Sequence, residues 1–418
     1  MEGLDFRPYE AYKDSRASWL GEVPADWQVG PGRICIYENK DKNTGMKEST
    51  VLSLSYGRVI VKDEDKMTGL VPESYETYQI VQPGDIIIRG TDLQNDVTSL
   101  RTGLAKDHGI ITSAYINLRP KPNAYAEFLH YLLHSYDVKK VFYGLGSGLR
   151  QNLSYVDFKY LTIPLPSLSE QRAIVAFLDD KCAKIEGAVR IKEDQIALLR
   201  ERRQIIIQDA VTGGLNPAAP MKDSGIDWIG QIPAHWELKS IRYAFRFRNY
   251  QRVPISASDR EGKQGEYPYY GASGIIDYVQ DYIFDEDLIL IAEDGANLLS
   301  KSTPLAFVAT GKYWVNNHAH ILEPLFPGFK YWAELLSAAD YTVYISGSAQ
   351  PKLTRDRLGS VRVPVPPADE RNAIISFIEQ ESDKFRNAIS IKERQIAALK
   401  EYKTSLINAA VTGKIKVI

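Results

Sequence analysis

One stretch decides the fold, because it occurs twice. Residues 164–213 read PLPSLSEQRAIVAFLDDKCAKIEGAVRIKEDQIALLRERRQIIIQDAVTG, and residues 364–413 read PVPPADERNAIISFIEQESDKFRNAISIKERQIAALKEYKTSLINAAVTG. The two stretches align at a constant offset of 200 without a gap, and 21 of the 50 aligned positions are identical. Chance does not produce such a match, so the chain is a tandem duplication.

A second, shorter match precedes each copy. Asp14-Ser15, with Trp19, Gly21, Pro24-Ala25 and Trp27, recurs 209 residues later as Asp223-Ser224, with Trp228, Gly230, Pro233-Ala234 and Trp236. The regions between these matches, residues 40–150 and 250–350, share no extended similarity. The duplication has therefore kept its ends, while its middles have diverged.

Each repeated stretch is predicted to be one long helix. A proline pair precedes it, Ser169 or Asp369 is a candidate N-cap, and Gly213 or Gly413 stands where a glycine commonly ends a helix. Roughly 43 residues at a rise of 1.5 Å give a rod of about 65 Å.

Apolar residues recur along both helices at alternating steps of three and four, which predicts that the helices pack on one another as a coiled coil. The seam consists mainly of Ile185, Val189, Ile196, Leu199, Ile206, Phe385, Ile389, Ile396, Leu399 and Leu406. Lys192, Arg203, Lys392 and Lys403 interrupt it, either as cations that reach outward at the seam edge or as a polar layer that sets the register. An antiparallel pair needs only a short linker between the first helix and the second globular region, so we expect antiparallel packing.

The divergent middles are predicted to be rich in β-structure. Short strands are expected at residues 51–54, 80–81, 85–89 and 110–118, and at 274–279, 288–292, 305–309 and 320–322. An amphipathic helix follows in each case, at residues 124–135 and 329–338. The predicted fold is therefore α+β, a tandem pseudo-two-fold duplication with globular regions at 1–163 and 216–363 and spacer helices at 164–215 and 364–418.

Composition limits the function classes. Lys+Arg 51 against Asp+Glu 53 gives a net charge of -2, which excludes a chain held on nucleic acid by bulk charge alone. Two cysteines are too few for a disulfide framework, and no apolar run has the ~20 residues of a membrane span. We expect a cytoplasmic protein without a membrane segment.

One local stretch, residues 242–252, alternates basic and aromatic side chains as a phosphate-tracking element would. A strand with one solvated face would give the same pattern. His318 and His320 would share one face of a strand and could hold a metal, but no cysteine or carboxylate at fitting spacing joins them, so no metal site is predicted. Asn152-Leu153-Ser154-Tyr155 lacks the two central prolines of an adenine-methyltransferase signature. We find no catalytic constellation.

The duplicated architecture resembles the specificity subunit of type I restriction-modification systems. The resemblance is carried by Pro164-Leu165-Pro166 with Glu170, by Ala210-Val211-Thr212-Gly213 and by the paired tryptophan segments, and it covers nearly the whole chain. The second copy departs slightly at Pro367-Ala368-Asp369. Residues 267–276 with Asp294-Gly295 resemble one type of target recognition domain, and residues 82–87 fit another type.

The resemblance implies a non-catalytic subunit with two target recognition domains, each reading half of a bipartite site on double-stranded DNA. It implies two methyltransferase subunits docked on the helices, with S-adenosylmethionine bound to those subunits and no cofactor in this chain, and motor-nuclease subunits that can join. Half-sites about one DNA turn apart, ~34 Å, are within the reach of the helices. Because the middles differ, an asymmetric site is expected. The rival interpretation is an adaptor that uses the coiled coil to join protein partners and whose β-rich domains bind peptide or glycan.

Candidate DNA contacts follow from residue type and position in the loops. They are Arg89, Thr91, Arg101, Arg150 and Gln151 in the first region and Arg246, Arg248, Arg252, Tyr270, Ser273 and His318 in the second. Each has a competing explanation as an ordinary surface or loop residue.

Overall fold

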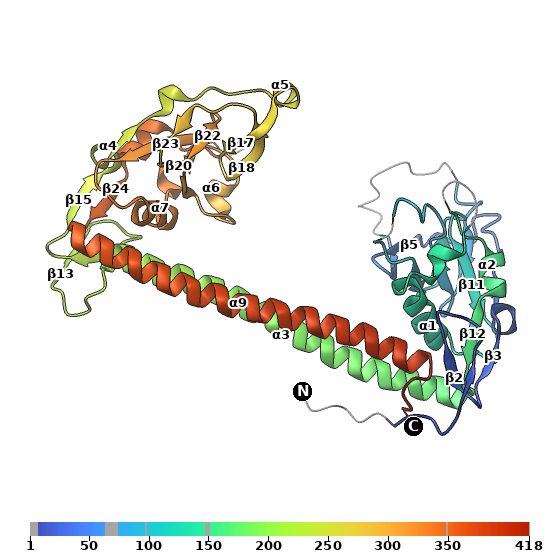
Figure 1. The fold of residues 1–418 in the computed structure, drawn as a ribbon. Coiled ribbons are helices and arrows are strands. Elements are labelled where there is room, and N and C mark those ends of the chain that lie inside the picture. The colour runs from blue at the N-terminus through green and yellow to red at the C-terminus, as the bar shows by residue number, and fades with distance from the viewer. Residues whose placement is uncertain (1–6, 63–73, 97, 147–150, 348–349, 418) are drawn as a thin grey trace. The chain divides into compact units, whose positions relative to one another are not determined.

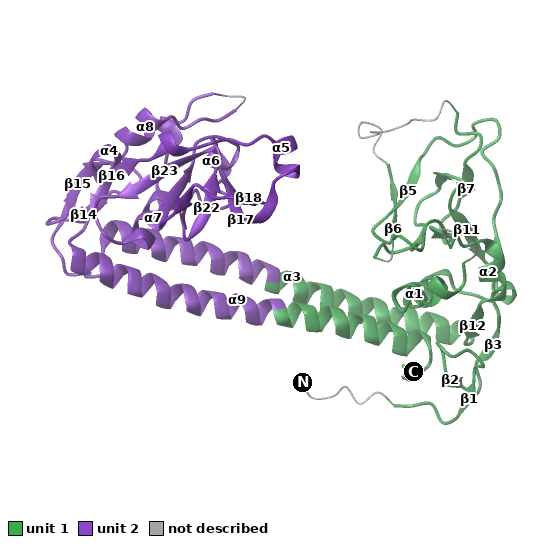
Figure 2. Ribbon diagram, turned by 45° about the horizontal axis from the view of Figure 1, so that its top comes forward, with its two compact units in different colours: residues 1–192, 394–418 green, residues 193–393 purple. Residues whose placement is uncertain are grey.

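The computed structural model describes residues 7–62, 74–96, 98–146, 151–347 and 350–417. The chain forms two compact units, of which unit 1 comprises residues 1–192 and 394–418 and unit 2 comprises residues 193–393 (Figure 2). Each unit contains one globular region and one half of each long helix. The long helices are α3 (Leu168–Gly213) and α9 (Ala368–Val411) (Figure 1).

The starts of the two helices differ slightly from the sequence-based expectation. Helix α3 begins at Leu168, and the backbone N–H of Glu170 donates to Ser167 Oγ at 3.3 Å. Ser167, not Ser169, therefore holds the N-cap position, directly after the proline pair. In α9 the corresponding position is Pro367, and Asp369 lies inside the first turn.

The helices pack antiparallel, as the connection argument predicts. In unit 1, Lys403 Nζ donates to Glu186 Oε1 at 2.6 Å and Lys192 Nζ donates to Gln395 Oε1 at 2.8 Å. In unit 2, Arg203 Nη2 donates to Ser382 Oγ at 3.2 Å. The residue numbers of the contacting residues in α9 therefore fall as those in α3 rise, which is the pattern of two antiparallel helices. Three of the four seam cations thus have a polar partner on the opposite helix, which fits both cations at the seam edge and a polar layer that sets the register.

The predicted seam residues all lie in the packed or half-buried part of the helix surfaces. Ile185, Ile196, Phe385 and Leu406 are buried, and Val189, Leu199, Ile206, Ile389, Ile396 and Leu399 are half-buried. Gly187 is accommodated without interrupting α3.

A tryptophan–glutamate contact at the start of each helix explains why both ends of the duplication are similar. In unit 1, Trp27 Nε1 donates to Glu170 Oε1 at 3.1 Å. In unit 2, Trp236 Nε1 donates to Glu370 Oε2 at 2.9 Å. The short tryptophan segment and the helix start, distant in sequence, therefore form one joint in each copy.

The C-terminal ends of α3 and α9 differ in backbone conformation, although their sequences are alike. Gly413 has φ +70°, and a Cβ there would lie 2.2 Å from Pro24 Cδ, so glycine is required. In the first copy α3 continues through Gly213, and Gly214 has the positive φ, +76°. The prediction that Gly213 ends the helix is wrong by one residue.

In unit 1 the main sheet has the order β4 (Ile36–Glu38), β11 (Ile116–Pro120), β8 (Ile86–Ile88), β9 (Thr102–Leu104), and α1 (Ala126–Val138) packs on it. Two-stranded pairs surround it: β1 (Tyr12–Asp14) with β2 (Glu22–Pro24), β3 (Gln28–Pro31) with β12 (Thr162–Leu165), β5 (Leu52–Ser55) with β6 (Arg58–Val61), and β7 (Gln79–Val81) with β10 (Gly109–Ile111). The single strand predicted at 110–118 is two strands, β10 and β11, separated by a turn that Thr112 and Tyr115 close.

In unit 2 the main sheet has the order β16 (Phe245–Phe247), β23 (Ala319–Pro324), β20 (Leu288–Ala292), β21 (Ala306–Ala309), and α7 (Phe329–Ala338) packs on it. A second sheet has the order β18 (Gly274–Val279), β17 (Gln264–Gly271), β22 (Lys312–Val315), β19 (Phe284–Asp285). The pairs β13 (Met221–Asp223) with β14 (Gln231–Pro233) and β15 (Glu237–Ser240) with β24 (Arg362–Val365) complete the strands.

The main sheets of the two units share one topology. In both, the last of the four strands in chain order lies between the first and the second. Short helices before the proline pairs also correspond, α2 (Tyr155–Tyr160) in unit 1 and α8 (Arg355–Ser360) in unit 2. The middles therefore keep a common framework that sequence comparison does not reveal, and they differ in what is attached to it. Among the described residues, no helix is long and apolar enough to cross a membrane.

Candidate functional site

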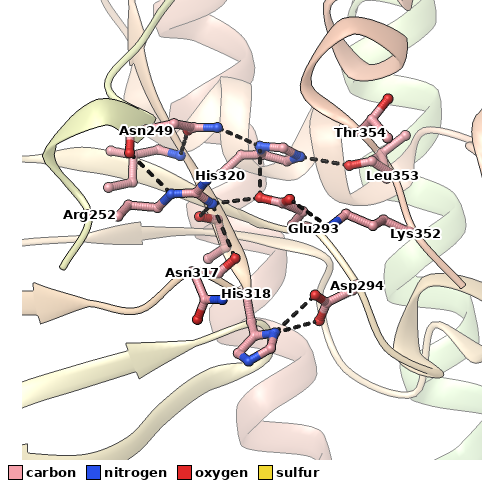
Figure 3. A network of polar contacts seen from close by, with 12 residues as sticks. Asn249, Arg252, Glu293, Asp294, Asn317, His318, His320, Lys352, Leu353 and Thr354 are labelled. Atoms are coloured by element: carbon pink, nitrogen blue, oxygen red, sulfur yellow. Dashed lines mark hydrogen bonds and ion pairs between the residues drawn. The ribbon is translucent and has the colours of Figure 1, made fainter. Parts of the chain in front are cut away.

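The basic stretch predicted to follow phosphates turns partly inward in unit 2. Arg252, next to the short 3-10 helix Asn249–Gln251, is 17% exposed, and its Nη1 donates to Glu293 Oε2 at 2.5 Å and to the carbonyl of Ala319 at 2.8 Å (Figure 3). These bonds fix the chain after β16 against the end of β20. Arg252 is therefore mainly a support for the loops around it.

Glu293 is the centre of this polar network (Figure 3). Besides Arg252, it contacts Lys352 Nζ at 3.3 Å and His320 Nδ1 at 3.5 Å. Burial alone would raise the pKa of Glu293, but the Arg252 hydrogen bond and the surrounding positive charge lower it overall. A buried carboxylate that stays ionised needs such partners, so the network joins three segments of unit 2.

The two histidines do not share a face. His320 is buried in β23, with Nε2 2.7 Å from the carbonyl of Leu353 and Nδ1 2.8 Å from Asn249 Nδ2, and burial lowers its pKa. His318 precedes the strand and lies exposed, with Nδ1 2.9 Å from both carboxylate oxygens of Asp294. The expectation of one shared face is wrong because His318 lies in the turn before β23. The described residues contain no cluster of three or more His, Cys, Asp or Glu that could hold a metal.

The His318–Asp294 pair has the hydrogen-bonding distance of an acid–base pair. In the part of the chain that the structure describes, no hydroxyl or thiol is hydrogen-bonded to His318. The exposed ring can offer its second nitrogen to a ligand as a hydrogen-bonding group.

Arg246 and Arg248 share one acceptor, Glu323. Arg246 Nη1 lies 3.1 Å and Arg248 Nη1 2.9 Å from its carboxylate. Arg248 also reaches Glu286 at 3.0 Å and is 15% exposed, whereas Arg246 is 61% exposed. Arg246 is thus the member of the pair that can present its guanidinium to a partner.

Arg246 lines an open groove together with Arg242, Phe247 and Arg355. The Arg355 guanidinium lies over the Phe247 ring at 5.4 Å. Arg355, the first residue of α8, is not among the residues predicted from the sequence. The alignment at offset 200 extends upstream of the proline pairs, since Ser154 and Thr354 hold the N-cap positions of α2 and α8, and this extension would have indicated Arg355.

The other two candidates of unit 2 lie on the β17–β18 hairpin. Ser273 is exposed at its turn, between Gly271 and Gly274, which pair with each other. Tyr270 packs on Phe307 and Tyr313 with ring centroids 5.5 Å apart in both cases, and burial raises its pKa. Ser273 is available to a ligand, and Tyr270 belongs mostly to the support beneath it.

In unit 1, Arg101 is fully buried and holds a loop from inside. Its guanidinium donates to the carbonyls of Arg89, Thr91, Asp92 and Asp96 and to Tyr143 Oη, at 2.5 to 3.3 Å. All five N–H donors are thereby used. Direct contact of Arg101 with DNA is inconsistent with this burial, so its role is corrected to that of a support for the loop 89–96.

That loop presents the remaining candidates of unit 1. Arg89 is 40% exposed and lies 3.4 Å from Asp96, and Thr91 is exposed. Gln151 is exposed with φ +48°, next to Asn152, whose side chain accepts from the backbone of Asp92 at 2.9 Å. Arg150 lies outside the described residues.

The loop after the central strand of the main sheet is held in the same way in both units. The backbone N–H of Leu153 donates to the carbonyl of Gly90 at 2.7 Å in unit 1, and that of Leu353 donates to Glu293 at 2.8 Å in unit 2. In each unit the loop after the central strand, β8 or β20, is thus joined to the segment before the short helix. The framework is common, and the side chains that it presents are different.

Comparisons with known proteins agree with this arrangement. Residues 37–193 and 233–401 match the family model described as type I restriction modification DNA specificity domain. The chain is 22% identical to a protein named as the MjaX type I restriction enzyme specificity subunit of Methanocaldococcus jannaschii, with 99% of both chains covered. It is 28% identical over 151 residues, 36% of each chain, to the EcoprrI specificity subunit of Escherichia coli. A solved chain from a type I R-M system superposes with a TM-score of 0.64 at 16% identity, covering 93% of this chain and 98% of that one.

Proposed function

The chain belongs to the family of type I restriction modification DNA specificity domains, and from that premise we propose that it reads a two-part, asymmetric DNA sequence for a methyltransferase complex. Each unit would read one half of the sequence. One observation carries the proposal: the two units share one framework, and the exposed candidate side chains that they present on it are unlike.

The exposed candidate side chains of the two units are of types that read base edges and phosphates. Unit 1 offers Arg89, Thr91 and Gln151, and unit 2 offers Arg246, His318 and Ser273. Arginine and glutamine make paired hydrogen bonds to guanine and adenine, and serine or threonine bonds to any base. Two different sets imply two different half-sites, and hence a sequence without two-fold symmetry.

The long helices would hold the partner subunits. Their exposed faces repeat at offset 200, so each of two methyltransferase subunits would find a similar surface on this chain. The partners would bind S-adenosylmethionine and carry out the methylation, and motor-nuclease subunits would join the same assembly. In this proposal the chain itself supplies recognition and no catalysis.

The test is to produce the chain together with its methyltransferase partner in a host without DNA methylation and to map modified adenines across the genome. We expect methylation confined to one asymmetric motif in two parts with a fixed gap, and its loss when this chain is omitted. Methylation without a motif, or an unchanged motif in the absence of this chain, would contradict the proposal. A complex that forms without any DNA-dependent activity would instead support a protein adaptor.

A further inference from the structure

Unit 1 carries a two-stranded ribbon that contains none of the candidate DNA contacts predicted from the sequence. Strands β5 and β6 pair antiparallel, with Ser53 opposite Ile60 and Ser55 opposite Arg58 (Figure 2). Only Tyr56 and Gly57 connect them. Side chains alternate between the two faces of such a ribbon, so its inner and outer faces have separate roles.

The inner face anchors the ribbon. Leu52 and Val59 are buried against Val81, Ile87 and Ile111. Two glycines allow the close approach: a Cβ at Gly103 would lie 2.5 Å from Leu54 Cδ1, and one at Gly109 would lie 2.8 Å from Leu52 Cγ. The ribbon is therefore firmly attached to the sheets of unit 1.

The outer face carries Ser53, Ser55, Arg58 and Ile60. Arg58 is exposed and Ile60 is 45% exposed. Within the described parts of the chain, the side chains of Ser53, Ser55 and Arg58 form no hydrogen bond or ion pair. Arg58 acts on this unit only at longer range: the pKa of Glu186 is lowered chiefly by its hydrogen bond from Lys403, and Arg58 adds to that effect. These groups are free to bind a partner.

The backbone conformation at the tip of the ribbon is unfavourable for the residue that occupies it. Tyr56 has φ +46° and is 94% exposed. A two-residue turn with positive φ at both positions favours Asn-Gly, because a bulky side chain is strained there. An aromatic ring in this strained position, without a contact that would compensate within its own unit, indicates that it contacts another molecule.

We propose that the outer face of the β5–β6 ribbon enters a groove of the DNA and reads bases of the half-site assigned to unit 1. The inference rests on the proposed function. The major groove is wide enough for a two-stranded ribbon, where arginine bonds to guanine, serine bonds to any base, and an apolar group contacts the thymine methyl. Arg58, Ser55 and Ile60 supply these three types on one face, and Tyr56 at the tip stacks on exposed base or sugar.

The ribbon is continuous with the loop site already described. A Cβ at Gly57 would lie 2.9 Å from Leu100 Cδ1, so Leu100 packs directly against the tip of the ribbon. Leu100 is followed by Arg101, which holds the loop 89–96 from inside. The tip of the ribbon is therefore packed against the segment that leads into Arg101.

The test uses the full complex with its methyltransferase partner and the motif that the unchanged chain specifies. Arg58→Ala is expected to relax one base position in one half of the motif, by roughly 5- to 150-fold in discrimination, and to leave the other half unchanged. Tyr56→Asn should raise the thermal unfolding midpoint by roughly 2 °C, because it relieves the strained turn, while it weakens methylation of the motif.

Arg16→Gly is the matched control. Arg16 is exposed, has φ +61° and aligns with Gly225 of unit 2, which has φ +64°. Arg16→Gly also removes a cation and relieves backbone strain, but it does so away from the ribbon. The thermal unfolding midpoint should therefore rise, while the motif and the level of its methylation stay unchanged.

The outcomes separate the two proposals. If Arg58→Ala and Tyr56→Asn both methylate the same complete two-part motif as the unchanged chain, and to the same level, the role of the ribbon is overturned. The proposed function would still stand in that case. Absence of any motif for the unchanged chain would overturn both.

Discussion

At the scale of single residues, burial separates the arginines that support a recognition loop from those that can contact a ligand. Arg101 uses all five of its N–H donors on groups of its own unit. Arg89, whose own carbonyl Arg101 binds, is 40% exposed. Two arginines that are close in sequence therefore differ in burial, and we expect opposite roles for them.

Replacement of Arg101 by lysine tests this distinction. Lysine keeps the charge but has three donors, so at least two of the five acceptors lose their partner inside the protein, at a cost of about 2–4 kcal/mol in the stability of unit 1. We expect a lower unfolding midpoint, together with weaker recognition of one half-site. Thermal unfolding and methylation mapping measure the two effects.

Arg89→Ala is the control for Arg101→Lys. Its exposed ion pair with Asp96 contributes little to stability, so the unfolding midpoint should change hardly at all, while recognition of the same half-site weakens. Equal losses of stability in the two variants would contradict the assignment of support to one arginine and contact to the other.

At the scale of elements, the aligned glycines at the helix ends differ in what they tolerate. Gly413 has φ +70° and lies against the rigid ring of Pro24, whereas Gly213 is helical with open space around its Cα. Gly413→Ala should lower the stability of unit 1 by about 1–3 kcal/mol. Gly213→Ala should be neutral or slightly stabilising, since alanine favours the helix. Thermal unfolding of the two variants compares them, and equal shifts would contradict this interpretation.

The sequence predicts the long elements well and the short ones less well, for physical reasons. The helices and their antiparallel seam follow from a heptad pattern that is repeated at offset 200. The common order of the main sheets could not be predicted, because strands of three to six residues carry too little pattern and their pairing joins distant segments.

The candidate site was predicted only in part for a related reason. The exposed candidates Arg89, Arg246 and His318 lie on loops and at strand ends, where residue type and position are informative. The inward turn of Arg252 depends on Glu293, and that of Arg248 on Glu323, acceptors that come from segments distant in sequence. The β5–β6 ribbon was missed because its function depends on which face is buried, and one short strand does not show that.

At the scale of the whole molecule, charge predicts how the chain binds DNA. The net charge is -2, and several arginines of the basic stretch are neutralised by glutamates of unit 2. We therefore expect phosphate contacts from the partners to be added to base contacts from this chain in the complex.

The last prediction follows from counterion release. Each phosphate neutralised by a cation adds about -0.9 to the slope of log affinity against log salt concentration. The isolated chain should therefore bind a duplex containing its motif weakly and with a shallow slope, and the complex with the methyltransferase should bind tightly and with a steep one. Titrations between roughly 50 and 200 mM salt measure both slopes on the same duplex. A slope for the isolated chain as steep as that of the complex would show that this chain makes most of the phosphate contacts itself. In that case, alanine substitutions of exposed cations in both units, such as Arg58 and Arg246, would identify which residues make those phosphate contacts.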